Sequence, residues 1–106
     1  MRFVTKQGDT RNALKATLTT AEGGTPADVD NIKFRMSNTL YHNKIFRHVD
    51  IIALPEVGVI FTPEEVAEAG SYYGEFVFTY TDGKVETFPN SGYMEIKILQ
   101  NLGGDS

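Results

Sequence analysis

The sequence predicts an all-β protein built as a single antiparallel β-sandwich. Roughly six to eight short segments alternate between apolar and polar residues or are rich in β-branched and aromatic residues, with turn signals about every ten residues. The chain has 106 residues, 41% hydrophobic and 11% aromatic, which suits a globular domain rather than a disordered chain. We therefore expect one sandwich domain over residues 1–100 and a flexible tail over residues 101–106, which show no pattern.

The central strand signal lies in residues 72–80, where Phe76, Phe78 and Tyr80 occupy alternate positions. This spacing is typical of a strand with one buried face. The same rings could form a stacking platform for single-stranded nucleic acid or sugar. At strand period, in a chain without tryptophan, they are better explained as core residues.

The residues that follow predict a hairpin. Asp82-Gly83 is a favoured two-residue loop, because a type I′ turn needs positive φ at both positions. Pairing across such a loop sets Tyr80 opposite Val85 and Phe78 opposite Thr87. We therefore expect the large residues of the first strand to share a face with Val85.

Further strands are predicted on both sides of this hairpin. In residues 93–98, an apolar stripe alternates with Glu95 and Lys97, which turn outward. Alternation predicts strands over residues 12–18 and 29–36 as well. The residues expected inward in these three strands are Leu14, Ala16, Leu18, Ile32, Phe34, Met36, Met94, Ile96 and Ile98. Short strands are also expected at residues 3–4 and 57–61, and residues 46–54 are β-rich without a clean two-residue phase.

One short helical turn is expected around residues 63–69. Thr62 followed by Glu65 has the spacing of a capping box, Pro63 suits the first helical position, and Gly70 is a suitable stop. The acidic first turn also complements the helix dipole. This turn would join two strands at one end of the domain.

Composition and charge restrict the possible functions. There is no cysteine, which removes disulfides, cysteine nucleophiles and cysteine-based zinc motifs, and the net charge of −4 argues against general nucleic-acid binding. Residues 1–48 carry eight Lys/Arg and four Asp/Glu, whereas residues 49–106 carry two and ten. Either strands from the two halves interleave and neutralise each other, or the molecule has opposite poles that stack on copies of itself or on a charged partner.

No segment predicts export or membrane insertion. The N-terminal residues turn polar before an apolar core of signal-peptide length appears. The longest apolar run, Ile51-Ile52-Ala53-Leu54, is far too short to span a bilayer. We therefore expect a protein that is made and kept soluble, with no export tag of its own and no membrane partner.

The sequence offers few groups for catalysis. His42 and His48 are the only imidazoles, and strand alternation would put His48 and Asp50 on one face. Solvent-facing residues on a strand explain this pair better than a catalytic dyad does. Any acidic domain contains carboxylate pairs like those of glycosidases, and no Gly-rich phosphate loop is complete. The sequence predicts no catalytic residues.

Two acidic clusters raise the question of a metal site. Glu64, Glu65 and Glu68 share the predicted helical turn, and Asp28 and Asp30 lie in a loop. Calcium needs about six or more converging oxygens, usually from a loop with a glycine at its bend. Residues 28–31 supply only part of such a loop, so a solvated helix face and a capped turn are the better explanation. We expect no metal and no cofactor.

Three aromatic residues are expected at the surface: Tyr41, Tyr73 and Phe88. An exposed aromatic side chain more often marks a protein interface than a catalytic site. The polar segment 37–50 is either a binding loop or a long connection.

Several short motifs carry a resemblance to a known family. They are the Asp82-Gly83 turn, Glu86-Thr87-Phe88-Pro89, Gly92-Tyr93 before the closing strand, Gly70-Ser71-Tyr72 at the entry to the aromatic strand, Gly8-Asp9-Thr10-Arg11 followed by Leu14, and Phe61-Thr62-Pro63-Glu64-Glu65. Together they resemble the N-terminal immunoglobulin-like domain of the tailed-phage baseplate upper protein family, which also occurs as small stand-alone proteins. The chain departs from the family pattern at Asn12, where proline is expected, and over residues 37–54.

This resemblance implies an immunoglobulin-like antiparallel β-sandwich and a non-enzymatic structural role in the virion of a tailed bacteriophage. The module would belong to the tail tip or baseplate, as a homo-oligomer or bound to neighbouring tail or fibre proteins. A head or neck decoration protein is a related placement. The resemblance supplies no catalytic, cofactor-binding or metal-binding residues. The alternative from another class is a carbohydrate-binding module for the host cell wall, which would present several aromatic rings flat in a groove.

Overall fold

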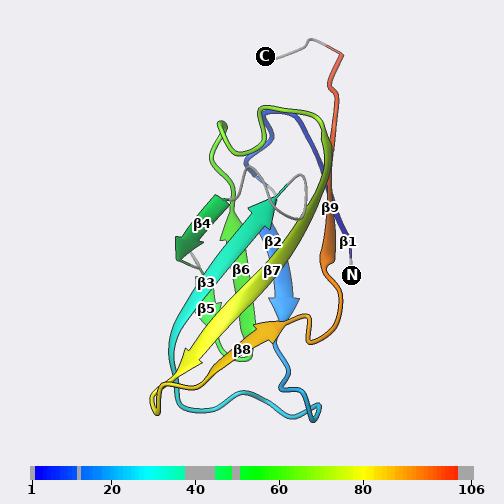
Figure 1. The fold of residues 1–106 in the computed structure, drawn as a ribbon. Helices are drawn as coiled ribbons and strands as arrows, with labels where there is room; N and C mark the ends of the chain where they lie inside the picture. The colour runs from blue at the N-terminus through cyan, green and yellow to red at the C-terminus, as the bar shows by residue number, and fades with distance from the viewer. Residues whose placement is uncertain (1, 12, 38–44, 49–50, 103–106) are drawn as a thin grey trace.

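The computed structural model describes residues 2–11, 13–37, 45–48 and 51–102 (Figure 1). Over these residues the protein is all-β, with nine strands and no helix. In chain order the strands are β1 (Arg2–Lys6), β2 (Ala13–Thr17), β3 (Val29–Ser37), β4 (Ile45–His48), β5 (Ile51–Ala53), β6 (Glu56–Ile60), β7 (Gly70–Tyr80), β8 (Val85–Phe88) and β9 (Met94–Leu99).

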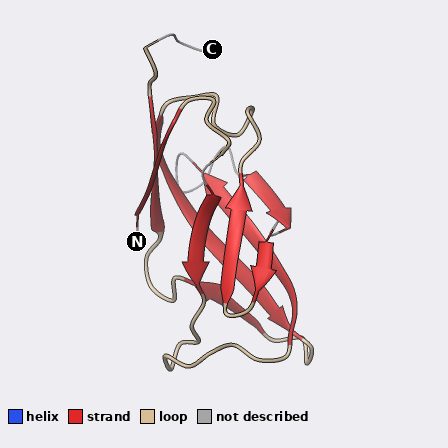
Figure 2. Cartoon of the chain, turned by 180° about the vertical axis from the view of Figure 1, so that it is seen from behind, coloured by secondary structure: helices blue, strands red, loops and turns tan. Residues whose placement is uncertain are grey.

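The strands form two sheets that lie against each other (Figure 2). The larger sheet has the order β1-β9-β7-β3-β4, and β8 also pairs with β7. The smaller sheet has the order β2-β6-β5. All described pairs are antiparallel except β1 with β9, which run parallel. The 11-residue β7 is long enough to pair with β9 along its first half and with β8 along its second.

Both sheets contribute to one core. Alternation predicts its members correctly, because all nine residues expected to point inward from the three alternating strands are buried. Phe34 lies at its centre, with its ring centroid 5.4 Å from that of Phe76 and 5.9 Å from that of Phe61. Since Phe61 directly follows β6, these ring contacts connect the two sheets. Phe76 and Phe78 are fully buried, and Tyr80 is half-buried against the same core.

The hairpin between β7 and β8 forms, but its predicted register is wrong by one residue. Thr79 pairs with Val85, and Phe78 pairs with Glu86. Val85 therefore points away from the core and is 59% exposed, instead of sharing a face with the aromatic residues.

The turn geometry explains this shift. The Gly83 N–H donates to the Tyr80 carbonyl at 2.9 Å, and the Tyr80 N–H donates to the Lys84 carbonyl at 2.8 Å. Gly83 has a φ of 90°, whereas Asp82 has no positive φ and instead accepts the Lys84 N–H on Oδ1 at 3.0 Å. This is a three-residue loop, a type I turn followed by a G1 bulge, rather than the two-residue type I′ loop.

The expected helical turn around residues 63–69 is not formed. Two i→i+3 hydrogen bonds are present, from the Glu65 N–H to the Thr62 carbonyl at 3.1 Å and from the Ala67 N–H to the Glu64 carbonyl at 3.4 Å. The capping-box side chains do bond. Glu65 Oε1 accepts the Thr62 N–H at 2.8 Å, and Thr62 Oγ1 accepts the Glu65 N–H at 3.4 Å. The segment is therefore a capped turn.

Contacts with the N-terminal segment explain why no helix follows. The carbonyl of Val66 accepts the Gly8 N–H at 3.1 Å, and the carbonyl of Ala67 accepts Gln7 Nε2 at 2.9 Å. In a continuing helix these carbonyls would accept the N–H groups of Gly70 and Ser71, but those two residues instead begin β7. Gln7 also binds Asn101, whose Nδ2 donates to the Gln7 carbonyl at 3.0 Å. Leu102 beyond it is fully exposed.

Tyr80 predicts a pH dependence of stability. Burial, the hydrogen bond that its hydroxyl donates to Glu86 and the nearby carboxylates of Glu86, Glu22 and Asp82 raise the pKa of Tyr80 to about 12. This stabilisation is complete below the unfolded pKa of about 10 and is lost as the pH rises through the folded value. We expect the urea midpoint to fall between pH 10 and 12, and to fall less in Tyr80→Phe. Tyr93→Phe, which leaves the Tyr80–Glu86 bond intact, should behave as wild type.

Candidate functional site

The groups considered for catalysis and metal binding do not assemble into a site within the described residues. His42 and Asp50 lie outside those residues, as do Tyr41 and most of segment 37–50. Glu64 and Glu68 are exposed on the capped turn. In the part of the chain that the structure describes, no group of three or more acidic or histidine side chains could hold a metal ion.

The predicted surface aromatics are placed differently from each other. Tyr73 is 41% exposed, as expected, whereas Phe88 is half-buried and packs against the core. Tyr93 is 48% exposed, and its ring centroid lies 5.7 Å from that of Tyr73 with the planes 59° apart. The exposure of Tyr93 was not predicted, although extending the alternation of the last strand back from Met94 would have turned its side chain outward.

Tyr73 belongs to the outer face of the larger sheet, the face turned away from the core. The outer face is defined by the alternate residues of four strands: Arg2, Val4 and Lys6 of β1, Glu95, Lys97 and Leu99 of β9, Ser71, Tyr73, Glu75, Val77 and Thr79 of β7, and Lys33, Arg35 and Ser37 of β3. Tyr93, just before β9, lies against Tyr73.

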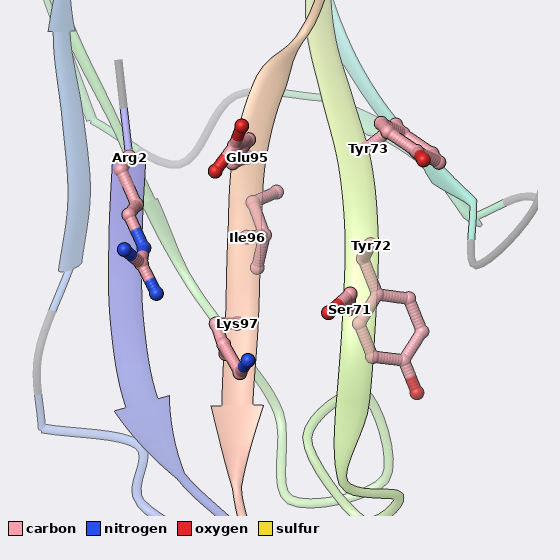
Figure 3. A pocket seen from close by; sticks show the side chains of 7 residues that line it. All are labelled: Arg2, Ser71, Tyr72, Tyr73, Glu95, Ile96 and Lys97. Carbon is pink, nitrogen blue, oxygen red and sulfur yellow. The ribbon is translucent and has the colours of Figure 1, made fainter.

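A shallow depression of about 280 Å³ lies on this outer face across β1, β9 and β7 (Figure 3). Strand register places Arg2 beside Glu95 and Glu95 beside Tyr73 in one row. In the next row Lys97 lies beside Ser71. The short Ser71 side chain leaves space between longer neighbours.

The depression presents charges that are free to meet a ligand or a partner. Among the described residues, Arg2, Glu95 and Lys97 have no ion-pair partner within 4.0 Å, whereas Arg35 and Glu75 on the same face pair with each other. Two cations, one carboxylate, a hydroxyl and a tyrosine ring can form hydrogen bonds and flat contacts. This arrangement is suited to binding.

Charge is distributed by position in the fold and not by sequence half. Arg35 from the basic half pairs with Glu75 from the acidic half, and β1 lies beside β9. The strands of the two halves therefore interleave. The outer-face residues of β1, β3, β7 and β9 include five Lys/Arg and two Glu, a net charge of +3 on a chain of net charge −4.

Comparison with known proteins adds no family to this description. A scan against models of protein families finds no match for the chain, and a search of curated proteins finds none either. No described helix is long and apolar enough to cross a membrane. The function of the chain must therefore be inferred from its fold and its outer face.

Proposed function

We propose that this chain is a non-enzymatic structural module of a tailed-phage virion, acting in the tail tip or baseplate by docking to neighbouring proteins or to copies of itself. The observation that carries the proposal is the outer face. It presents an exposed tyrosine pair on a broad sheet, beside Arg2, Glu95 and Lys97, which form no ion pair within the part of the chain that the structure describes. Exposed Tyr and Arg are enriched at protein interfaces.

Strand order supports an immunoglobulin-like sandwich. The order β9-β7-β3-β4 corresponds to strands G, F, C and C′ of a variable-type domain, and β2-β6-β5 corresponds to B, E and D. The cysteine pair and tryptophan of antibody domains are absent from the sequence, so the correspondence concerns architecture alone.

The motifs that carry the phage resemblance also bear on the outer face. Gly92-Tyr93 precedes β9, and Gly92 has a φ of 73°, which glycine adopts without strain. Gly92 thereby lets the chain turn into β9 with Tyr93 against Tyr73. The resemblance and the exposed aromatic pair thus involve the same short segment.

The proposal predicts that the protein is part of the particle. Phage particles would be induced from the strain that encodes the chain and purified by density gradient. We expect the protein in those particles by mass spectrometry, with antibody labelling at the tail end by electron microscopy. Protein found in the lysate but missing from purified particles would overturn the proposal, while labelling of the head would replace the tail assignment with a decoration role.

The tyrosine pair also favours the second candidate, a carbohydrate-binding module for the host cell wall. Aromatic rings beside hydrogen-bonding groups are suited to stacking on sugars, although a 59° angle between the two rings is not one flat platform. Under the structural proposal, purified protein should not sediment with isolated cell walls. Sedimentation that Tyr73→Ala abolishes and Val85→Ala preserves would favour the carbohydrate function instead.

A further inference from the structure

The outer face combines positive charge with exposed apolar side chains. Besides its net charge of +3, it carries Val4, Tyr73 and Leu99, which are 44%, 41% and 38% exposed. A solvated sheet face usually alternates more cleanly to polar residues. Positive charge and exposed apolar area together indicate a docking surface for a partner that presents acidic side chains.

A surface with the opposite charge to the outer face lies on the same molecule, at the end of β7. This surface, the hairpin end, comprises the loop between β2 and β3 with the first two residues of β3, and the β7–β8 hairpin, which lie side by side at the bottom of Figure 1. Its charged residues are Glu22, Asp28, Asp30, Asp82, Lys84 and Glu86, a net charge of −4. The Thr81 N–H donates to the Asp28 carbonyl at 2.8 Å and the Ala21 N–H to Glu86 Oε2 at 2.9 Å, so the two segments form one unit.

Edge-to-edge pairing of two copies is disfavoured by contrast. No described strand pairs with the free edge of β1. An antiparallel two-fold pairing centred on Val4 would put Arg2 opposite Lys6 of the second copy. Like charges directly opposite are destabilising, and basic residues on an edge strand protect it from such pairing.

We propose that the outer face of the larger sheet docks the hairpin end of a second copy of this chain. This inference deepens the assembly role proposed above and names its partner. A face that binds a different surface of its neighbour makes a heterologous contact, which builds rings or open rows rather than a two-fold dimer. Opposite charges set the register and speed the encounter, and the exposed apolar residues lie within the contact.

The test is light scattering of the purified full chain over a range of concentrations. At about 0.01 M salt, where screening is weak, we expect the mean mass to rise above the monomer with concentration. The apparent affinity should fall at least about tenfold when salt is raised to about 0.15 M. A strict monomer at all concentrations in low salt would overturn the inference.

Charge-reversal variants identify the two surfaces. A face variant, Lys33→Glu with Lys97→Glu, and an end variant, Glu22→Lys with Asp30→Lys, should each be monomeric alone. All four side chains are exposed, so folding should be retained, which circular dichroism would check. Mixing the two variants should restore association as a one-to-one pair, because the unaltered hairpin end of the face variant can dock on the unaltered outer face of the end variant.

The matched control reverses charge at the other end of the molecule. Glu64→Lys with Glu68→Lys changes the net charge as much as the end variant does, but on the capped turn before β7. This control should associate as wild type. Loss of association in the control, or no recovery on mixing, would overturn the assignment of surfaces. A monomer found in purified particles would refute this inference alone, whereas an oligomer missing from particles would refute only the virion proposal.

Discussion

Replacing Phe34 with alanine is expected to lower the free energy of unfolding by about 3–5 kcal/mol. Phe34 is completely buried, and its ring contacts those of Phe61 and Phe76. Truncation removes the buried apolar ring and leaves a cavity between the two sheets. The measurement is urea unfolding followed by circular dichroism, with the midpoint compared at constant slope.

The control for this prediction is Val85→Ala, an apolar truncation on the same sheet. Because Val85 is 59% exposed, its loss should change the free energy of unfolding by no more than about 0.5 kcal/mol. If Phe34→Ala cost as little as Val85→Ala, the two sheets could not share the core described above. A loss of 3–5 kcal/mol is a large part of the total stability of a small domain, about 5–15 kcal/mol, so low temperature or a stabilising salt is advisable.

The alternation of apolar and polar residues predicted the buried side chains well, because successive side chains of a strand point to opposite faces of the sheet. Each strand with a clear apolar stripe, such as Leu14 to Leu18 or Met94 to Ile98, buries that stripe. The alternation within one strand does not show which distant strand it pairs with. In the parallel pairing of β1 with β9, five residues near the start of the chain meet a strand near its end. The ring centroid of Phe3 in β1 also lies 5.7 Å from that of Phe61.

The two turn predictions were wrong for a shared reason. Asp82-Gly83 is compatible with both a type I′ loop and a type I turn with a bulge, and the capping box of Thr62 and Glu65 is compatible with both a helix and a single turn. At each of these two turns, the local sequence is therefore compatible with two conformations. Contacts from elsewhere select one, as the bonds of Gly8 and Gln7 to residues 66 and 67 show.

The candidate site was predicted only in part. Exposure of Tyr73 followed from the sequence, but the depression joins Arg2, Ser71 and Glu95, which come from three strands far apart in the chain. Only strand order and register bring them together. The same holds for the charge of the outer face, since its basic residues come from strands of both sequence halves and not from the basic first half alone.

Gly74→Ala is expected to lower the free energy of unfolding by about 1–3 kcal/mol, although alanine ordinarily stabilises a strand relative to glycine by about 0.4–1 kcal/mol through the unfolded chain. Gly74 lies on the inward face of β7, paired with Met94 and Met36. A Cβ there would come within 2.6 Å of Ile96 Cδ1 and 3.2 Å of Phe34 Cε1. Both neighbours are buried, so neither can move aside freely.

The clash with Ile96 can be tested directly, because Ile96→Val removes the Cδ1 atom that an alanine at position 74 would meet. Alone, Ile96→Val should cost about 0.5–1.5 kcal/mol. Combined with Gly74→Ala, the total loss should be smaller than the sum of the two single losses, since the methyl added at one position occupies space vacated at the other.

Gly24→Ala is the matched control: its new Cβ would meet only Thr20 Oγ1 at 3.5 Å, an ordinary contact. Strictly additive losses, or a Gly74→Ala variant as stable as Gly24→Ala, would show that the sheet relaxes around position 74 and that close approach of Ile96 and Phe34 does not require glycine there.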